Sequence, residues 1–160
     1  MKTGIAILVV SESSLQLSLT IAKHLPGSNL YSSFESIFTD TIPSIATFLK
    51  EHFNRFEAFV FVGSLGICVR SIAPFITDKH TDPAIVNIDS TGKYIVSVLS
   101  GHIGGANEFA QYVCARFDGC RAFVSTATDQ TNSFAFDMYA KKNGFKIENI
   151  SFFIKNLSQL

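Results

Sequence analysis

The chain of 160 residues carries 13 basic and 13 acidic residues, so it lacks the basic excess that a nucleic-acid-binding surface requires. Apolar residues make up 47% of the sequence and charged residues only 16%, which excludes a disordered chain. A chain of this length buries roughly 70% of its unfolded surface. We therefore expect one domain with a hydrophobic core of its own.

The sequence begins with a short apolar run, Gly4–Val10, after a single lysine. About six apolar residues are too few for the hydrophobic region of a secretory signal, and no stretch approaches the ~18 to 20 apolar residues of a membrane-spanning helix. We expect a cytoplasmic protein without membrane contact. Cys68, Cys114 and Cys120 have neither an even number nor the close spacing of a metal site, so we expect reduced structural thiols and no bound metal.

Strands and helices alternate along the first half of the chain. After the strand Gly4–Val10, apolar residues recur at helical spacing over residues 15–25. Asn29–Ser32 is a weak second strand. Thr41 is expected to cap a second helix with a proline in its first turn. Glu57–Val62 is apolar on both faces, as a strand covered by helices on both sides must be.

The second half continues this alternation and adds a hairpin. A helix over residues 65–73 is expected to end at Pro74, because proline has no backbone N–H to donate. Ala84–Ile88 and Tyr94–Leu99 are β-rich runs joined by a short glycine-containing turn, which indicates a hairpin and hence a mixed sheet. An amphipathic helix and the last clear strand, Arg121–Ser125, follow.

The alternation with short loops predicts an α/β fold. We expect a layered αβα sandwich around a mainly parallel, mixed sheet of the flavodoxin or Rossmann type. A helix from about Ser133 to Lys142 ends at an Asn-Gly pair, which is a typical helix end. We therefore place the α/β domain over residues 1–143 and expect residues 144–160 to begin a following segment.

Four loops follow predicted strands, and we expect them to line one crevice, because ligands of open α/β sheets bind at the carboxyl ends of the strands. Their small residues allow close approach, and the first amides of the following helices offer donors to a carboxylate or phosphate. The alternative is that the glycines only permit tight turns and the hydroxyls only cap helices. The loops are residues 11–14 (SESS), 63–66 (GSLG), 100–105 (SGHIGG) and 125–129 (STATD).

His102 is the strongest acid/base candidate, because an imidazole titrates near neutrality and this one lies within a glycine-rich loop; the alternative is a histidine that only donates a hydrogen bond to a loop carbonyl. Asp82 and Asp129 are the carboxylates expected to orient it or to act beside it, with turn-forming roles as the alternative. The candidate binding residues are small or polar loop residues and one arginine, for which a solvated helix face is the alternative. They are Gly63, Ser64, Gly66, Arg70, Ser100, Gly101, Gly104, Gly105, Asn107 and Thr126.

Four motifs occur in order between Phe59 and Asp129: G-x-x-G-I-x-V-R, D-K-x-T-D-P, L-S-G-H-x-G-G-A-N and T-A-T-D. In these motifs the chain resembles the N-terminal region of the cobalt-precorrin-5A hydrolase family. The resemblance implies that water opens the δ-lactone of cobalt-precorrin-5A, that the two-carbon fragment leaves as acetaldehyde, and that cobalt-precorrin-5B is formed in anaerobic cobalamin biosynthesis. It implies no organic cofactor, since the cobalt is carried by the substrate.

The resemblance also implies a C-terminal domain of the same enzyme as a partner, and we recognise no such domain before Leu160. If the active site lies between domains, this chain alone binds weakly and catalyses nothing. Two other interpretations stay open: a non-catalytic binding domain for the same anionic tetrapyrrole, and a flavodoxin-like mononucleotide-binding domain, which the SESS loop favours. A homodimer also stays open.

Overall fold

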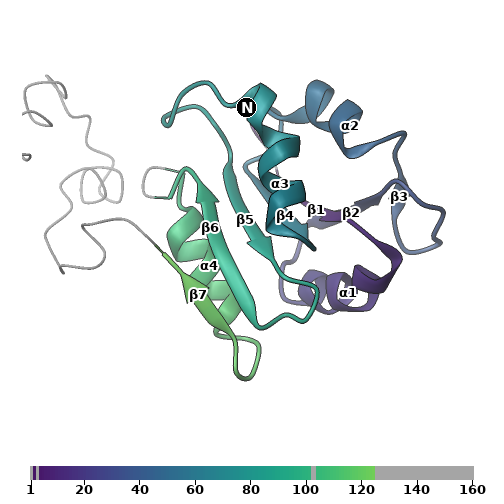
Figure 1. Cartoon of the computed structure of the whole chain (residues 1–160), viewed down its shortest axis with the longest axis vertical. Coiled ribbons are helices and arrows are strands. Elements are labelled where there is room, and N and C mark those ends of the chain that lie inside the picture. Colours follow the sequence, from purple (N-terminus) through teal and green to yellow (C-terminus); the bar gives the residue numbers. More distant parts are fainter. Residues whose placement is uncertain (1, 3, 102–103, 125–160) are drawn as a thin grey trace, which may run out of the picture. The chain divides into compact units, whose positions relative to one another are not determined.

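The computed structural model describes residues 2, 4–101 and 104–124, and they form a seven-stranded sheet in the order β3-β2-β1-β4-β5-β6-β7 (Figure 1). The strands are β1 (Ile5–Val9), β2 (Ser28–Ser32), β3 (Asp40–Thr41), β4 (Ala58–Val62), β5 (Ala84–Ile88), β6 (Tyr94–Leu99) and β7 (Arg121–Phe123). The helices are α1 (Leu15–Lys23), α2 (Ile45–His52), α3 (Leu65–Ile72) and α4 (Ala106–Cys114), with 3-10 turns η1 (Glu12–Ser14) and η2 (Ala73–Phe75). The predicted α/β sandwich is confirmed.

The strand directions divide the sheet into two groups. Strands β1 to β5 are mutually parallel, β6 is antiparallel to β5, and β7 is parallel to β6; the arrows of β5 and β6 point in opposite directions in Figure 1. The predicted hairpin and mixed sheet are therefore confirmed. Strands β1, β4 and β5 finish at one end of the sheet, which we call the Gly63 edge. Strands β6 and β7 finish at the opposite end, which we call the Gly101 edge.

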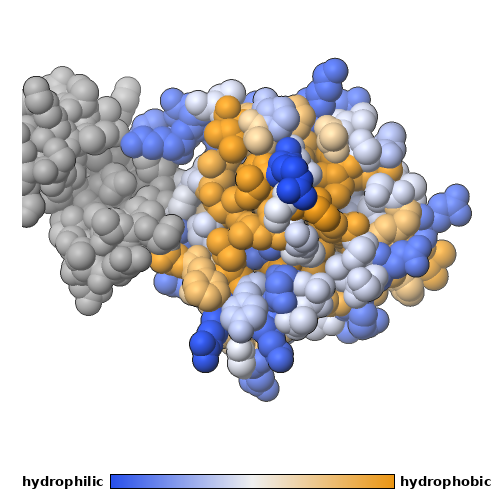
Figure 2. Space-filling view, viewed as in Figure 1, coloured by the Kyte–Doolittle hydropathy of each residue, from blue (hydrophilic) through white to orange (hydrophobic). Residues whose placement is uncertain are grey.

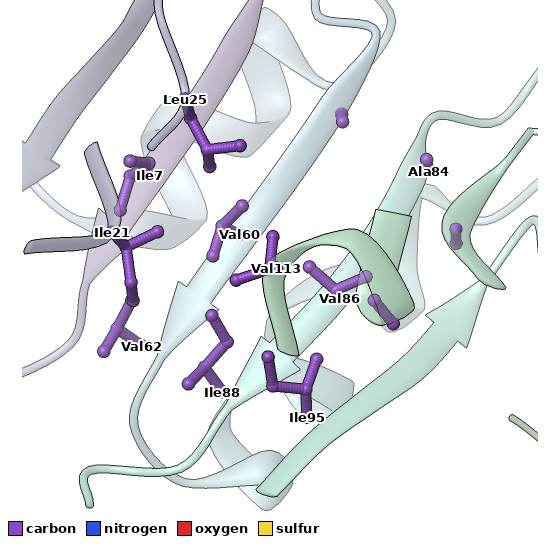
Figure 3. Packing of buried hydrophobic residues seen from close by; sticks show 13 residues of the cluster. Ile7, Ile21, Leu25, Val60, Val62, Ala84, Val86, Ile88, Ile95 and Val113 are labelled. Carbon is purple, nitrogen blue, oxygen red and sulfur yellow. The ribbon is translucent and has the colours of Figure 1, made fainter. Parts of the chain in front are cut away.

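One face of the sheet is covered by α1 and α4. Alternate residues of β4 and β5 point to this face, because side chains alternate along a strand, and they pack against apolar residues of both helices (Figure 3). The residues labelled there are Ile7, Ile21, Leu25, Val60, Val62, Ala84, Val86, Ile88, Ile95 and Val113. This core includes Ile95 of β6, so it extends beyond the parallel strands.

The other face is covered by α2 and α3. Phe59 and Phe61 of β4 are fully buried there, together with Leu49 of α2 and Cys68 of α3. Among the described residues, the buried part of this core contains no residue of β6 or β7. Helices α2 and α3 therefore cover this face of the sheet only as far as about β5.

The predicted cap of the second helix is wrong. Helix α2 begins at Ile45, and its cap is Ser44, whose hydroxyl accepts a hydrogen bond from the N–H of Thr47 at 3.0 Å. Thr41 belongs to the short strand β3 and pairs with Ser32. The chain stays extended at Thr41 because the next residue's N–H bonds to the carbonyl of Ser32 at 2.8 Å.

The three cysteines are free thiols, as predicted. Burial raises the pKa of Cys68 to about 12. Burial, together with a hydrogen bond to Cys114, raises the pKa of Cys120 to about 12. Both groups are therefore protonated at neutral pH.

Within the described ranges, no helix has the length and apolar composition needed to cross a membrane. The helix predicted over Ser133–Lys142 and the boundary at residue 143 lie outside the described residues, so both stay predictions.

Candidate functional site

Gly63 holds the end of β4 tightly against β1. Its φ is +149°, and an added Cβ would lie 2.8 Å from the Cβ of Val10. Its N–H donates to the carbonyl of Ile88 at 2.8 Å, and its own carbonyl accepts from the side-chain amide of Asn87 at 3.1 Å. Gly63 thus serves the packing of three strand ends, which is the turn-forming role kept open above.

Ser64 and Gly66 begin helix α3 on this edge. The carbonyl of Ser64 accepts hydrogen bonds from the N–H groups of Ile67 and Cys68, while its hydroxyl makes no capping bond. A Cβ added at Gly66 would lie 3.4 Å from a guanidinium nitrogen of Arg70. The exposed arginine therefore folds back over the first turn of α3 and places a positive charge there.

The loop between β6 and α4 closes on itself at the Gly101 edge. Ser100 has a left-handed backbone, with φ +57°. Its carbonyl accepts from the N–H of Ala106 at 3.2 Å, and the carbonyl of Gly101 accepts from the N–H of Asn107 at 3.0 Å. The expectation that the first amides of α4 are open donors is therefore wrong for Ala106 and Asn107.

The glycines of this loop permit close internal contacts. A Cβ added at Gly101 would lie 2.6 Å from Oδ1 of Asn107, and a Cβ added at Gly104 would lie 2.3 Å from the Cβ of Ser100. Gly105 has φ +83°, yet an added Cβ there would meet no atom within 4 Å. The conformation of the loop thus requires glycine at positions 101 and 104, whereas the space beside the Cα of Gly105 is open.

Asp82 anchors the loop before β5. Its carboxylate accepts hydrogen bonds from the N–H of Thr77 at 2.9 Å, from the hydroxyl of Thr77 at 2.8 Å and from the N–H of Asp78 at 3.1 Å. Burial would raise the pKa of this carboxyl, but these hydrogen bonds and the charge of Lys2 hold the pKa below its ordinary value. Asp82 is therefore an anion at neutral pH and a weak base.

Asp82 and Ser100 meet at the Gly101 edge. The hydroxyl of Ser100 donates to the main-chain carbonyl of Asp82 at 3.2 Å, and both residues are buried. The structure thus joins the loop that contains Asp82 to the predicted glycine loop, although their sequence positions are 18 residues apart. The catalytic role of Asp82 stays a prediction.

The expectation that the strand-end loops line one crevice is wrong. Gly63, Ser64, Gly66 and Arg70 lie at the Gly63 edge, because β4 ends there. The predicted binding residues after β6 lie at the opposite edge, because β6 is antiparallel to β5. They are Ser100, Gly101, Gly104, Gly105 and Asn107. His102, Thr126 and Asp129 lie outside the described residues, so their roles stay predictions.

A cavity of about 500 Å³ opens beside Gly105. It lies between the end of α1 and the first turns of α4, and Leu25 and Phe109 give it a mainly apolar lining. The polar side chains of His24 and Glu108 also line it. Its size suits a small molecule, but the carboxylate of Glu108 disfavours an anion there.

Sequence analysis missed two residues with a clear role in these sites. Thr77 holds the carboxylate of Asp82 through both its N–H and its hydroxyl. Asn87 is buried in β5, and its Oδ1 has no hydrogen-bond partner among the described residues. An asparagine inside an otherwise apolar strand was the available signal for Asn87, since a buried amide needs partners.

The fold and the loop geometry define an α/β sandwich domain whose glycine loop and buried carboxylate meet at one end of a mixed sheet. The family model described as Cobalamin synthesis G N-terminal matches residues 47–129 of this chain, which is more than half of its length. The chain belongs to this family. The matched segment includes both strand-end loops described above and the Asp82 loop between them.

Two curated relatives bear the name cobalt-precorrin-5A hydrolase. The protein of Salmonella typhimurium is 35% identical over 111 residues, covering 69% of this chain and 31% of the relative. The protein of Priestia megaterium is 40% identical over 106 residues, covering 66% of this chain and 28% of the relative. The matched part of the chain thus spans about a third of the length of these relatives.

A solved structure agrees with the fold. The crystal structure of a cobalamin biosynthesis protein G homolog from Sulfolobus solfataricus is similar with a TM-score of 0.62 and 24% sequence identity. The similarity covers 81% of this chain and 39% of that chain. At this identity the likeness supports the fold alone.

Proposed function

We propose that the chain forms the N-terminal part of an enzyme that hydrolyses the δ-lactone of cobalt-precorrin-5A and releases acetaldehyde, giving cobalt-precorrin-5B. The observation that supports this most strongly is the family match over residues 47–129, which contains the Asp82 loop and the glycine loop. The names of the two relatives agree with it. Those relatives are about three times as long as the matched segment, so our proposal includes a C-terminal domain of the same enzyme that completes the active site.

The reaction sets two requirements. Lactone opening needs an activated water and stabilisation of a tetrahedral oxyanion. Loss of acetaldehyde then needs removal of a proton from the hydroxyl of the two-carbon fragment, while the electrons of the broken C–C bond pass into the conjugated macrocycle. The macrocycle is its own electron sink and carries the cobalt, so no organic cofactor is required.

We divide this work between His102 and the Asp82 loop according to their chemistry. His102 is the group that takes and returns protons, since its ordinary pKa lies near neutrality. Asp82 is a fixed anion with its oxygens engaged by Thr77 and Asp78. It is therefore a positioning residue that holds its own loop, and through Ser100 the glycine loop, in place.

The substitution His102→Ala tests this proposal. In the full-length enzyme it should lower single-turnover release of acetaldehyde from cobalt-precorrin-5A by roughly 10² to 10⁴-fold, while substrate binding falls much less. His52→Ala on helix α2 is the matched control and should leave the rate within about twofold. Retention of most activity by folded His102→Ala would transfer the proton-transfer role to Asp129 or to the C-terminal domain. Absence of acetaldehyde from the wild-type reaction would overturn the proposed function itself.

A further inference from the structure

An apolar surface lies on the α3 side of β6 and β7. Tyr94 is 47% exposed and Phe123 is 53% exposed, and their ring centroids lie 5.9 Å apart. Tyr94 pairs with Arg121, and Val96 pairs with Phe123. Because side chains alternate along strands, these four residues share one face, opposite to Ile95 in the core beneath α4.

Helix α3 and the residue that follows η2 extend this surface. Leu65, Val69 and Ile76 are 41%, 45% and 45% exposed, whereas Cys68 and Ile72 are buried against the sheet. Figure 2 shows hydrophobic surface that continues over α3, β5 and β6. We call the six residues Leu65, Val69, Ile76, Tyr94, Val96 and Phe123 the apolar platform.

The apolar platform ends at the candidate site. Val98 and Leu99 of β6 pack against the core on the same side, and Ser100 follows them directly. Ile76 directly precedes Thr77, which binds the carboxylate of Asp82. A ligand lying on the platform would therefore present one rim to the residues of the Gly101 edge.

Positive charges border the apolar platform. Arg121 is exposed on the same face as Tyr94 and Phe123, and exposed Arg70 folds over the first turn of α3. The carboxylate of Asp89 in the β5–β6 turn is already engaged, since it accepts hydrogen bonds from the N–H groups of Thr91 and Tyr94. The formal net charge of the chain is zero, so an anionic ligand must meet such local charge.

We propose that the apolar platform binds the flat face of an anionic tetrapyrrole, with Arg70 and Arg121 meeting its peripheral carboxylates. This inference rests on the proposed function, because the substrate class comes from it. A large exposed apolar surface marks an interaction site, and a planar guanidinium matches the geometry of a carboxylate. The combination of aromatic rings with flanking arginines fits a carboxylate-rich macrocycle better than an apolar peptide.

Calorimetric titration of the 160-residue chain under anaerobic conditions with cob(II)yrinic acid, a corrinoid carrying seven carboxylates and at most one axial ligand, tests the apolar contacts. The double variant Tyr94→Ser/Phe123→Ser should raise the Kd at least about tenfold, because aromatic side chains dominate such contacts. Tyr112→Ser is the matched control: Tyr112 is 43% exposed and lies on α4, on the opposite face of the sheet. It should leave the Kd within about twofold.

Charge reversal tests the proposed contact between Arg121 and the carboxylates of the ligand. Arg121→Glu should raise the Kd severalfold and make binding less dependent on salt, whereas Arg116→Glu, in the turn after α4, should change neither. Because Arg121 is exposed, this variant is expected to fold even if the aromatic double variant does not, and circular dichroism checks both. The proposal is overturned if both Tyr94→Ser/Phe123→Ser and Arg121→Glu bind the probe with wild-type affinity. It is also overturned if the wild-type chain does not bind the probe at millimolar concentration.

Two further outcomes separate this inference from its alternatives. If the platform variants keep wild-type affinity for the corrinoid but abolish self-association in sedimentation velocity, the surface is a protein interface and the proposal is wrong. Binding of the probe needs no turnover, so a chain that binds it through the platform while the full-length enzyme releases no acetaldehyde contradicts the proposed function alone. A full-length enzyme whose platform variants keep the wild-type kcat and KM contradicts the platform alone.

Discussion

Asp82 shows how one buried carboxylate connects a loop to the candidate site. It is 5% exposed, and it stays ionised because Thr77 and Asp78 donate hydrogen bonds to both of its oxygens. Its main-chain carbonyl at the same time accepts from Ser100. Its charge therefore stabilises the fold as well as the site, and the two effects can be measured separately.

Asp82→Asn is expected to lower the free energy of unfolding by about 1–2 kcal/mol at pH 7, because an amide replaces one acceptor oxygen with a donor facing other donors. The folded-state pKa of Asp82 is lowered, so its stabilisation is complete above the unfolded pKa of about 3.9 and is lost as the pH falls through the folded value. Urea unfolding at pH 7 and at pH 3 measures this. An equal difference between the proteins at both pH values would contradict the assignment.

The glycines show where residue-scale reasoning from sequence reached its limit. Sequence analysis found Gly101 and Gly104 but could not tell close approach of a ligand from close approach within the loop. The structure shows contacts within the loop, with an added Cβ at Gly104 2.3 Å from the Cβ of Ser100. A loss of ligand binding in Gly104→Val would therefore report on loop geometry first and on ligand contact second.

At the scale of elements, the sequence prediction places the cap of α2 three residues too early. Ser44 and Thr41 both lie shortly before the helix, and both residue types cap helices. The hydrogen bond from the N–H of Thr47 identifies Ser44 as the cap. Pairing with β2 decided the outcome at Thr41, and sequence alone does not display such a tertiary contact.

Ser44→Ala should lower the free energy of unfolding by about 1 kcal/mol, because the N–H of Thr47 loses its acceptor. Thr41→Ala is the matched control, since Thr41 is exposed and caps no helix in the structure; it should cost less than about half as much. Thermal and urea unfolding of both variants provide the comparison. A larger loss for Thr41→Ala would return the cap to Thr41.

Strand identity was predictable and loop placement was not fully so. Ala84–Ile88 and Tyr94–Leu99 are strands with the predicted bounds, because β-rich runs flanking a glycine turn are a strong local signal. The same hairpin reverses the direction of β6, which sends the following glycine loop to the opposite edge. The expectation of one crevice applied the rule for wholly parallel sheets to a sheet already predicted to be mixed.

At the scale of the whole molecule, the residues of the sequence motifs lie at two opposite edges of the sheet. The Gly63 edge holds Ser64 and the guanidinium of Arg70, which folds back from the last turn of α3, and the Gly101 edge holds Asp82 and Ser100. The apolar platform lies between α3 and β7, and it adjoins the Gly101 edge through Ile76 and Leu99. A macrocycle on that surface would contact Arg70 through its peripheral carboxylates, while Arg70 stays away from the reacting groups.

This arrangement predicts which pairs of substitutions are coupled. Residues in one hydrogen-bond network lose activity non-additively, whereas distant residues act independently within about 0.3–0.5 kcal/mol. Asp82→Asn and Thr77→Val share the hydrogen bond from the Thr77 hydroxyl to the Asp82 carboxylate, so their combined effect on acetaldehyde release by the full-length enzyme should differ from the sum by about 0.5 kcal/mol or more. Asp82→Asn and Ser64→Ala lie at opposite edges and should be additive.

Single-turnover rates of the four proteins of each cycle measure both coupling energies under the same conditions. Urea unfolding of the same proteins shows whether the Asp82–Thr77 coupling also appears in stability, as a shared positioning role requires. Strong coupling of Asp82 with Ser64 instead, and none with Thr77, would mean that the chemistry spans both edges. In that case the site would have to be sought across the α3 face of the sheet, with the Gly101 edge contributing only its fold.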